Sequence, residues 1–243
     1  MIKGLYRSAS AMIPRIKQQE TIANNLANAA APGFKRDKVF SKELSRVQAK
    51  QAMSRSDWQT PMIDQVYADH SQGTLDRTDN PLDMALEGSG FFVLEGEDGE
   101  LFLTRAGNFM VSPDGFLVSP GGHRVLSEGG PIAITSGEIS VSEAGQVAVD
   151  GTEVGRIRVA DITEPAELTK SGDSEFRVPE GIELRAAVDY VIRNGYLEAS
   201  NVNTIREMVD MISSFRSYES DAQALKAQDD SLEKLINNVG RIR

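Results

Sequence analysis

The two ends of this chain carry the same seven-residue repeat of apolar side chains. Over residues 2–26, seven of the eight positions in the two rows of the repeat are apolar. The rows are Ile2, Ala9, Ile16 and Ala23, and Leu5, Met12, Gln19 and Leu26. This is the a/d pattern of helices that pack along a common seam, with one polar member that can set the register.

The C-terminal repeat predicts one long helix. Nine of the ten seam positions are apolar, and no Gly or Pro interrupts residues 202–239. The rows are Met208, Phe215, Ala222, Asp229 and Ile236, and Met211, Tyr218, Leu225, Leu232 and Val239. Asn201 or Asn203 is expected to cap the start of this helix. At the other end of the chain, Pro14 predicts a kink or break in the N-terminal helix.

The middle of the chain, residues 75–197, changes to short β-branched and aromatic runs. Turn sequences such as Asp98-Gly99, Pro113-Asp114-Gly115 and Gly121-Gly122 separate these runs. This alternation is typical of hairpins and predicts an all-β domain. Residues 35–74 have no clear period and are interpreted as a linker or extended segment, although residues 37–53 have a helical composition.

The sequence therefore predicts a mixed α and β fold, with N- and C-terminal helices forming a coiled-coil-like core and a central all-β domain. The expected segments are an N-terminal core helix at 1–34, a linker at 35–74, the β domain at 75–197 and a C-terminal core helix at 198–243. On periodicity alone, an intramolecular helical hairpin or a dimerising coiled coil is as well supported as polymerisation, which apolar faces wider than the seams would suit.

Charge and composition exclude several classes of partner. The formal net charge of −10 argues against nucleic-acid binding and against an anionic membrane surface. The chain contains no cysteine, so it has no disulfide or thiolate metal site. No apolar run reaches the roughly 18 residues of a membrane span. The N-terminus lacks the features of a secretory signal peptide, so no cleavage is expected.

No catalytic, cofactor-binding or metal-binding residues are predicted, and an enzyme is not expected. The two histidines, His70 and His123, lack ligand spacing and are expected in solvated or turn positions. Acidic clusters, at Glu95 to Asp98 and at Glu164 and Glu167, could in principle supply a glycosidase pair. Their place in predicted turns favours solvated hairpin tips, unless two carboxylates converge in a pocket.

Four stretches resemble the flagellar rod and hook protein family. The first combines Asn24-Asn25-Leu26-Ala27-Asn28 with Pro32-Gly33-Phe34-Lys35, and the second runs from Asn80-Pro81-Leu82-Asp83 to Phe92. The third is Thr104-Arg105-Ala106-Gly107-Asn108-Phe109, and the fourth runs from Gly195 to Asn203. They follow the family order and span almost the whole chain.

The resemblance implies a structural subunit of the bacterial flagellar basal-body rod, which polymerises axially through its terminal helices and transmits torque. The proximal rod protein is the nearest match. The distal rod and hook subunits are alternatives, and a soluble coiled-coil adaptor is a further one. Expected partners are copies of itself, other rod proteins and the flagellar type III export apparatus, with no nucleic acid and no direct membrane insertion. The rod would cross the periplasm.

The expected assembly interface combines apolar seam residues with asparagines at the end of the first helix. Its members are Leu5, Met12, Ile16, Asn24, Asn25, Leu26, Asn28, Met211, Phe215, Tyr218, Leu225 and Leu232.

Overall fold

The computed structural model describes residues 2–42, 62–134, 137, 139–162, 168–172, 174–179 and 181–239. The chain forms two compact units, each assembled from separate stretches of sequence. The helical unit comprises Met1–Ala27, Asp37–Ala68 and Asn203–Arg243, and the β unit comprises Asn28–Arg36 and Asp69–Val202. Glu164 and Glu167 lie outside the described residues.

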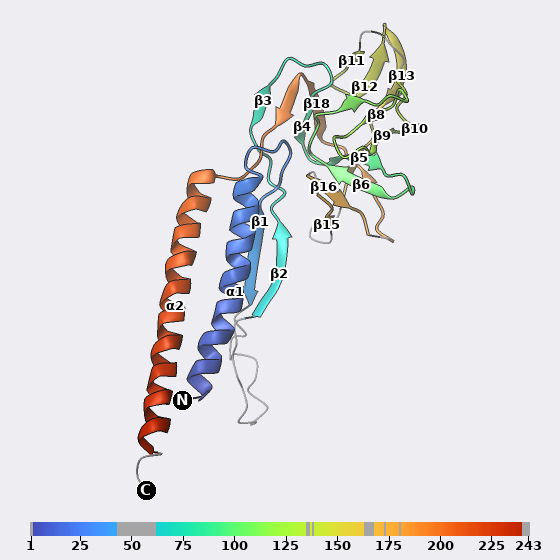
Figure 1. Ribbon diagram of the computed structural model, residues 1–243. Coiled ribbons are helices and arrows are strands. Elements are labelled where there is room, and N and C mark those ends of the chain that lie inside the picture. The colour runs from blue at the N-terminus through green and yellow to red at the C-terminus, as the bar shows by residue number, and fades with distance from the viewer. Residues whose placement is uncertain are drawn as a thin grey trace. The chain divides into compact units, whose positions relative to one another are not determined.

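The helical unit contains helix α1 (Ile2–Ala27), helix α2 (Thr204–Val239) and a two-stranded sheet. The two helices pack against each other, as Figure 1 shows in blue and orange. Strand β1 (Asp37–Lys42) pairs antiparallel with β2 (Met62–Ala68), and β1 contacts α1. The Asn203 Oδ1 accepts a 3.0 Å hydrogen bond from the Arg206 backbone N–H, so Asn203 caps α2. The predicted long C-terminal helix is confirmed, because α2 runs without interruption from Thr204 to Val239.

A break at Pro14, one of the two outcomes predicted there, does not occur, because helix α1 continues through the proline. Residues 37–53 have a helical composition, yet Asp37–Lys42 form a strand within the segment that was expected to be a linker or extended. This segment obtains its backbone partners from β2, and such pairing overrides a local propensity. Residues 43–53 lie outside the described residues.

The predicted coiled-coil-like core is wrong. Among the described residues the fold is mostly β-sheet with two helices, and the large apolar core lies in the β unit. On the helices, the seam residues Ile16 and Phe215 are 43% and 52% exposed, whereas Ser214 is buried. A heptad repeat shows that a helix has an apolar face, but it does not show which surface covers that face.

The β unit is built from short strands, as the turn-rich sequence predicts. The strands are β3 (Leu75–Arg77), β4 (Met84–Gly88), β5 (Phe91–Glu95), β6 (Leu101–Thr104), β7 (Met110–Val111), β8 (Leu117–Val118), β9 (Arg124–Ser127), β10 (Gly130–Pro131), β11 (Ile139–Val141), β12 (Gln146–Val149), β13 (Thr152–Arg156), β14 (Val159–Asp161), β15 (Thr169–Lys170), β16 (Glu175–Arg177), β17 (Arg185–Ala186), β18 (Tyr190–Asn194) and β19 (Tyr196–Glu198). The central β domain is therefore confirmed.

The main sheet has the strand order β15-β16-β6-β5-β9-β8-β7, with β14 and β17 joined beside β5 and β10 joined beside β9. Two smaller pairings connect distant parts of the sequence: β4 pairs with β18, and β3 pairs with β19. The central strand of the main sheet, β5, is almost wholly buried and contributes Phe92 and Leu94 to the core. The core also contains Met84 and Ile192, one from each strand of the β4–β18 pair.

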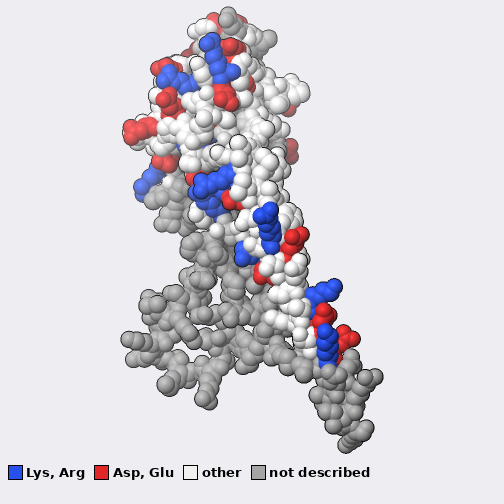
Figure 2. Space-filling model, turned by 90° about the vertical axis from the view of Figure 1, so that its left-hand side faces the viewer, with Lys and Arg blue, Asp and Glu red and all other residues white. Residues whose placement is uncertain are grey.

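The surface carries both signs of charge. On the face shown in Figure 2, basic and acidic side chains alternate along the described residues. No helix in the described part of the chain is long and apolar enough to cross a membrane.

Candidate functional site

Parts of all four sequence stretches that carry the resemblance meet inside the β unit. The Gly33 backbone N–H donates a 2.7 Å hydrogen bond to the Glu198 carbonyl, which joins the first stretch to the fourth. Gly33 has a φ of +65°, and a Cβ there would lie 2.2 Å from the Ala106 backbone nitrogen. Only glycine tolerates both this conformation and this close approach to the third stretch.

The second stretch joins the same junction through backbone contacts. The Met84 N–H donates a 3.0 Å hydrogen bond to the Gly107 carbonyl, and the Gly195 N–H donates a 2.8 Å bond to the Asp83 carbonyl. A Cβ on Gly107 would lie 1.6 Å from the Met84 carbonyl oxygen. The glycines in these stretches therefore allow backbone segments to touch.

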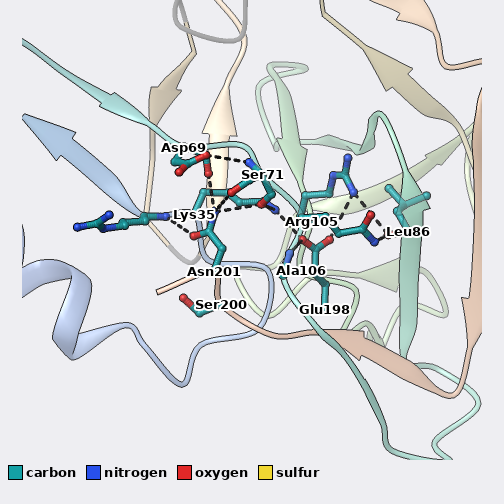
Figure 3. A network of polar contacts seen from close by, with 12 residues as sticks. Lys35, Asp69, Ser71, Leu86, Arg105, Ala106, Glu198, Ser200 and Asn201 are labelled. Atoms are coloured by element: carbon teal, nitrogen blue, oxygen red, sulfur yellow. Dashed lines mark hydrogen bonds and ion pairs between the residues drawn. The ribbon is translucent and has the colours of Figure 1, made fainter. Parts of the chain in front are cut away.

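A buried ionic network lies at the centre of the junction (Figure 3). The Lys35 Nζ lies 2.6 Å from Glu198 Oε1, and the Arg105 Nη1 lies 3.4 Å from Glu198 Oε2. The Lys35 and Glu198 side chains are 1% and 0% exposed, and Arg105 is also buried. Each residue comes from a different one of the four stretches, so the network links three of them directly.

Backbone groups provide further hydrogen bonds to the network. The Lys35 Nζ donates a 2.8 Å bond to the Ser71 carbonyl, and Arg105 Nη2 donates a 2.8 Å bond to the Gly88 carbonyl. The Gly73 N–H donates a 2.9 Å bond to Glu198 Oε1. Two cations share one carboxylate, and the carbonyl dipoles stabilise the remaining positive charge.

Burial lowers the pKa of Lys35 and the pKa of Arg105, because desolvation disfavours their charged forms. The Glu198 carboxylate opposes this effect for both groups by attraction and by hydrogen bonding. Removal of Glu198 would therefore leave two poorly solvated cations beside each other.

Asn201 extends the network to the edge of the β unit. Its Oδ1 accepts a 2.7 Å hydrogen bond from the Arg36 N–H, and its Nδ2 donates bonds of 2.8 Å and 3.0 Å to the Asp69 and Ser71 carbonyls. One amide side chain therefore holds two other backbone segments, at Arg36 and at Asp69 to Ser71. The arrangement suits a mechanical connection, because the charged groups at its centre are buried and bonded to protein atoms.

Asn25 makes a comparable connection within the helical unit. Its Oδ1 accepts a 2.8 Å bond from the Asp37 N–H, and its Nδ2 donates a 2.9 Å bond to the Asp37 carbonyl. The same Nδ2 lies 3.3 Å from Glu207 Oε2 on α2. Asn25 and Glu207 are both buried, so this asparagine joins α1, β1 and α2.

The predicted interface residues occupy different environments. Asn25 is buried, whereas Ile16, Asn24 and Phe215 are exposed. The partly buried members are Met12, Leu26, Asn28, Met211, Tyr218 and Leu225. The side chains of Leu5 and Leu232 lie outside the described residues.

The sequence analysis missed Lys35, Arg105 and Glu198 as functional residues, although all three lie within the four stretches. The sequence does contain a signal for this network. Each of the three residues lies within three positions of a glycine, and glycines permit backbone segments to approach closely. Charged residues are rarely fully buried unless they are paired, so such positions were candidates for mutual pairing.

His123 lies at a turn, as predicted, because its carbonyl accepts a 2.8 Å hydrogen bond from the Ser119 N–H, but the side chains of both histidines make specific contacts. The His123 Nδ1 lies 2.6 Å from Glu175 Oε2, and the His123 ring stacks on Phe102. His70 packs against Phe91 and Phe176. Neither belongs to a cluster of three or more metal-ligating side chains among the described residues.

Comparison with known proteins places these features in a family. Three family models match: "Flagella basal body rod protein" over residues 5–35, "Flagellar hook protein FlgE/F/G D1 domain" over 85–149, and "Flagellar basal body rod FlgEFG protein C-terminal" over 193–238. The flagellar basal-body rod protein FlgF of Caulobacter vibrioides is 30% identical over 245 residues, covering 100% of both chains. The chain belongs to the flagellar basal-body rod protein family.

Other relatives are also similar to this rod protein over nearly its whole length. FlgF of Salmonella typhimurium is 32% identical over 95% of this chain and 96% of its own. The flagellar basal-body rod protein FlgG of Agrobacterium fabrum is 29% identical over 98% of this chain and 100% of its own. The protein is a structural subunit of the flagellar basal-body rod, and rod proteins assemble with other basal-body components. The buried network therefore stabilises a structural subunit.

Proposed function

We propose that this rod subunit occupies the proximal part of the rod and polymerises with copies of itself and other rod proteins through its terminal helices. The observation that carries the assembly proposal is an exposed apolar stripe on α2. Ile205 is 72% exposed, and Val209, Ile212 and Phe215 are also more than half exposed. Their spacing places them along one side of the helix.

Such a stripe favours burial against another surface, because exposed contiguous apolar area is costly in water. The terminal segments 1–34 and 198–243 would make the assembly contacts, while the β domain at 75–197 would face outward. Of the predicted interface residues, Ile16 and Phe215 are available to a neighbour because both are exposed. Asn25 instead fixes the positions of α1, β1 and α2 within the subunit.

Proximal placement is favoured by the form Asn80-Pro81-Leu82-Asp83. In the structure this stretch is a closed turn, with the Asn80 Nδ2 donating a 3.0 Å hydrogen bond to Asp83 Oδ1. A distal position is the second candidate, because the FlgG relatives match over nearly the whole chain at similar identity. A role in catalysis is not proposed for either position.

The subunit would leave the cytoplasm through the flagellar type III export apparatus without a cleaved signal peptide, and the finished rod would cross the periplasm. The absence of cysteine from the sequence is compatible with passage between reducing and oxidising compartments. Mass spectrometry of the N-terminus of assembled protein would test this: an N-terminus beginning at Met1 or Ile2 is expected, and a shortened one would refute uncleaved export.

Electron microscopy of isolated basal bodies tests the position in the rod. A strain lacking this chain should have rods that are absent or stop near their base, and the wild-type gene should restore them. A long remnant that lacks only the outer part would favour the distal position. Normal rods in the deletion strain would refute a required structural role.

A further inference from the structure

A basic cleft lies on the surface of the β unit. Its volume is about 580 Å³, and its walls come from the end of β13, the start of β14 and the segment 184–190 that includes β17. Arg156, Arg158 and Arg185 line it, with Glu128 as the one acidic lining residue. Three arginines at one cleft contrast with a chain whose net charge is −10.

Two of these arginines have no counter-charge among the residues that the structure describes. Arg156 donates a 3.0 Å hydrogen bond from Nε to the Ala144 carbonyl, and its Nη1 lies 3.9 Å from Glu128 Oε1. Neither Arg158 nor Arg185 has a side-chain hydrogen bond or ion pair within the described part of the chain. Because Arg158 is half-buried, it has lost part of its hydration, and no described residue supplies an anion in exchange. An external anion would stabilise this cluster.

The cleft also has an apolar rim. Val188 is 88% exposed, and Leu184 lies along the same wall. A simple ion would use the arginines and leave Val188 in water. A peptide segment that combines carboxylates with an apolar side chain would use both parts of the cleft.

Such a segment exists on the β unit itself. The turn between β5 and β6 has the sequence Glu95-Gly96-Glu97-Asp98-Gly99-Glu100, followed by Leu101. Glu100 forms an ion pair with Arg177. Glu97 and Asp98 are exposed and make no side-chain hydrogen bond or ion pair in the described portion of the protein. The tip of this turn therefore presents two free carboxylates to an external partner.

We propose that the basic cleft of one subunit receives the acidic β5–β6 turn of a second copy of this chain. This inference rests on the proposed polymerisation with copies of itself. The two surfaces are complementary in charge but different in sequence, so the contact is head-to-tail. A head-to-tail contact that does not close into a ring gives open helical growth, as an axial structure requires.

Thiol cross-linking in the assembled rod provides a direct test, because the natural chain has no cysteine. The double variant Asp98→Cys/Ala186→Cys places one thiol on the turn and one in the cleft wall. Treatment of isolated basal bodies with a short bismaleimide should give dimers and higher multimers of the chain on a denaturing gel. The matched control is Asp114→Cys/Ala186→Cys, since Asp114 also precedes a glycine in an exposed turn.

The control should give at most a trace of multimers. Basal bodies that contain the double variant but give no Asp98→Cys/Ala186→Cys multimers would overturn the inference, as would equal multimers from the control. If the chain is absent from wild-type basal bodies, the proposed function fails first, so the two failures are distinguishable.

Charge exchange tests the chemistry of the contact. Arg158→Glu/Arg185→Glu should reduce the cross-linking yield and motility by at least tenfold, because carboxylates would then face Glu97 and Asp98. Adding Glu97→Lys/Asp98→Lys to the same chain should restore much of the cross-linking yield and much of the motility. Loss without restoration would refute pairing with the turn and would indicate an anionic partner other than a second copy.

Discussion

Lys35 and Glu198 are 163 positions apart in the sequence, yet their side chains form a 2.6 Å ion pair that is almost fully excluded from solvent. The same carboxylate contacts Arg105, so one acidic side chain neutralises two buried cations. The pair connects the segment after α1 to the end of β19. This relationship explains why Lys35, Arg105 and Glu198 can be buried together within these stretches.

Replacement of Glu198 by glutamine should strongly destabilise the β unit. The change keeps the shape of the side chain but leaves Lys35 and Arg105 buried without a counter-charge, which costs about 3–5 kcal/mol. Urea denaturation of the purified chain measures the change in the free energy of unfolding. Glu87→Gln is a matched control, because Glu87 forms an exposed ion pair with Arg193 and should cost less than about 1 kcal/mol. Equal losses of unfolding free energy from the two substitutions would show that burial does not make the Glu198 ion pairs more important for stability than an exposed pair.

Replacement of Asn25 by aspartate should destabilise the helical unit. The carboxylate can still accept the hydrogen bond from the Asp37 N–H, but it cannot donate to the Asp37 carbonyl and it would lie beside Glu207. Loss of a buried donor costs about 1–3 kcal/mol. Thermal unfolding followed by circular dichroism at 222 nm measures this cost. Asn24→Asp, at an exposed position on the same helix, should change the midpoint far less.

Gly33 should be much less tolerant of alanine than Gly99. Both have positive φ angles, +65° and +77°, so both substitutions carry the backbone strain of about 1 kcal/mol or more. Only at Gly33 would the added Cβ collide with backbone, at 2.2 Å from the Ala106 nitrogen, because no atom lies within 4 Å of the corresponding position at Gly99. Chemical denaturation should therefore show a clearly larger loss for Gly33→Ala. Similar losses would mean that the junction relaxes around the methyl group.

The elements of this fold were predictable where the signal is local. The long C-terminal helix follows from an uninterrupted apolar period, and the hairpins follow from turn dipeptides such as Asp98-Gly99, where Gly99 has a positive φ. The strand β1 was not predictable from Asp37–Lys42 alone, because its partner β2 comes 20 or more residues later. Local composition does not contain that pairing.

The candidate site could not be predicted from the sequence, because it is formed by contacts between distant segments. The four stretches could be quoted from the sequence, but their convergence depends on pairings such as β4 with β18. The coiled-coil prediction failed for a related reason: the heptad rows identified Phe215 as part of an apolar face, and this face is exposed in the subunit. Sequence periodicity identifies an apolar face, but it does not identify the surface that covers it.

The lowered pKa of Lys35 predicts a pH dependence of stability. Its unfolded pKa is about 10.4, and burial places the folded pKa below that value. Between the two values the unfolded chain binds more protons than the folded chain, so this residue makes the free energy of unfolding rise with pH in that window. Urea denaturation at pH values approaching the unfolded pKa of about 10.4 measures this slope, and Lys35→Met should make it less positive, because the other titrating groups are common to both proteins. An unchanged slope would mean that Lys35 titrates alike in both states.

The exposed stripe on α2 predicts an assembly defect that leaves the subunit folded. Phe215→Asp places a carboxylate on a half-exposed position, so the stability of the isolated chain should change by less than about 1 kcal/mol. Burial of that carboxylate against a neighbour in the rod would cost several kcal/mol, so incorporation into basal bodies should be lost. Immunoblots of isolated basal bodies, together with circular dichroism of the purified variant, separate assembly from folding. Gln223→Asp is the matched control, because Gln223 is also exposed on α2 but lies outside the apolar stripe. It should assemble normally, and normal incorporation of Phe215→Asp would exclude the stripe as an assembly surface.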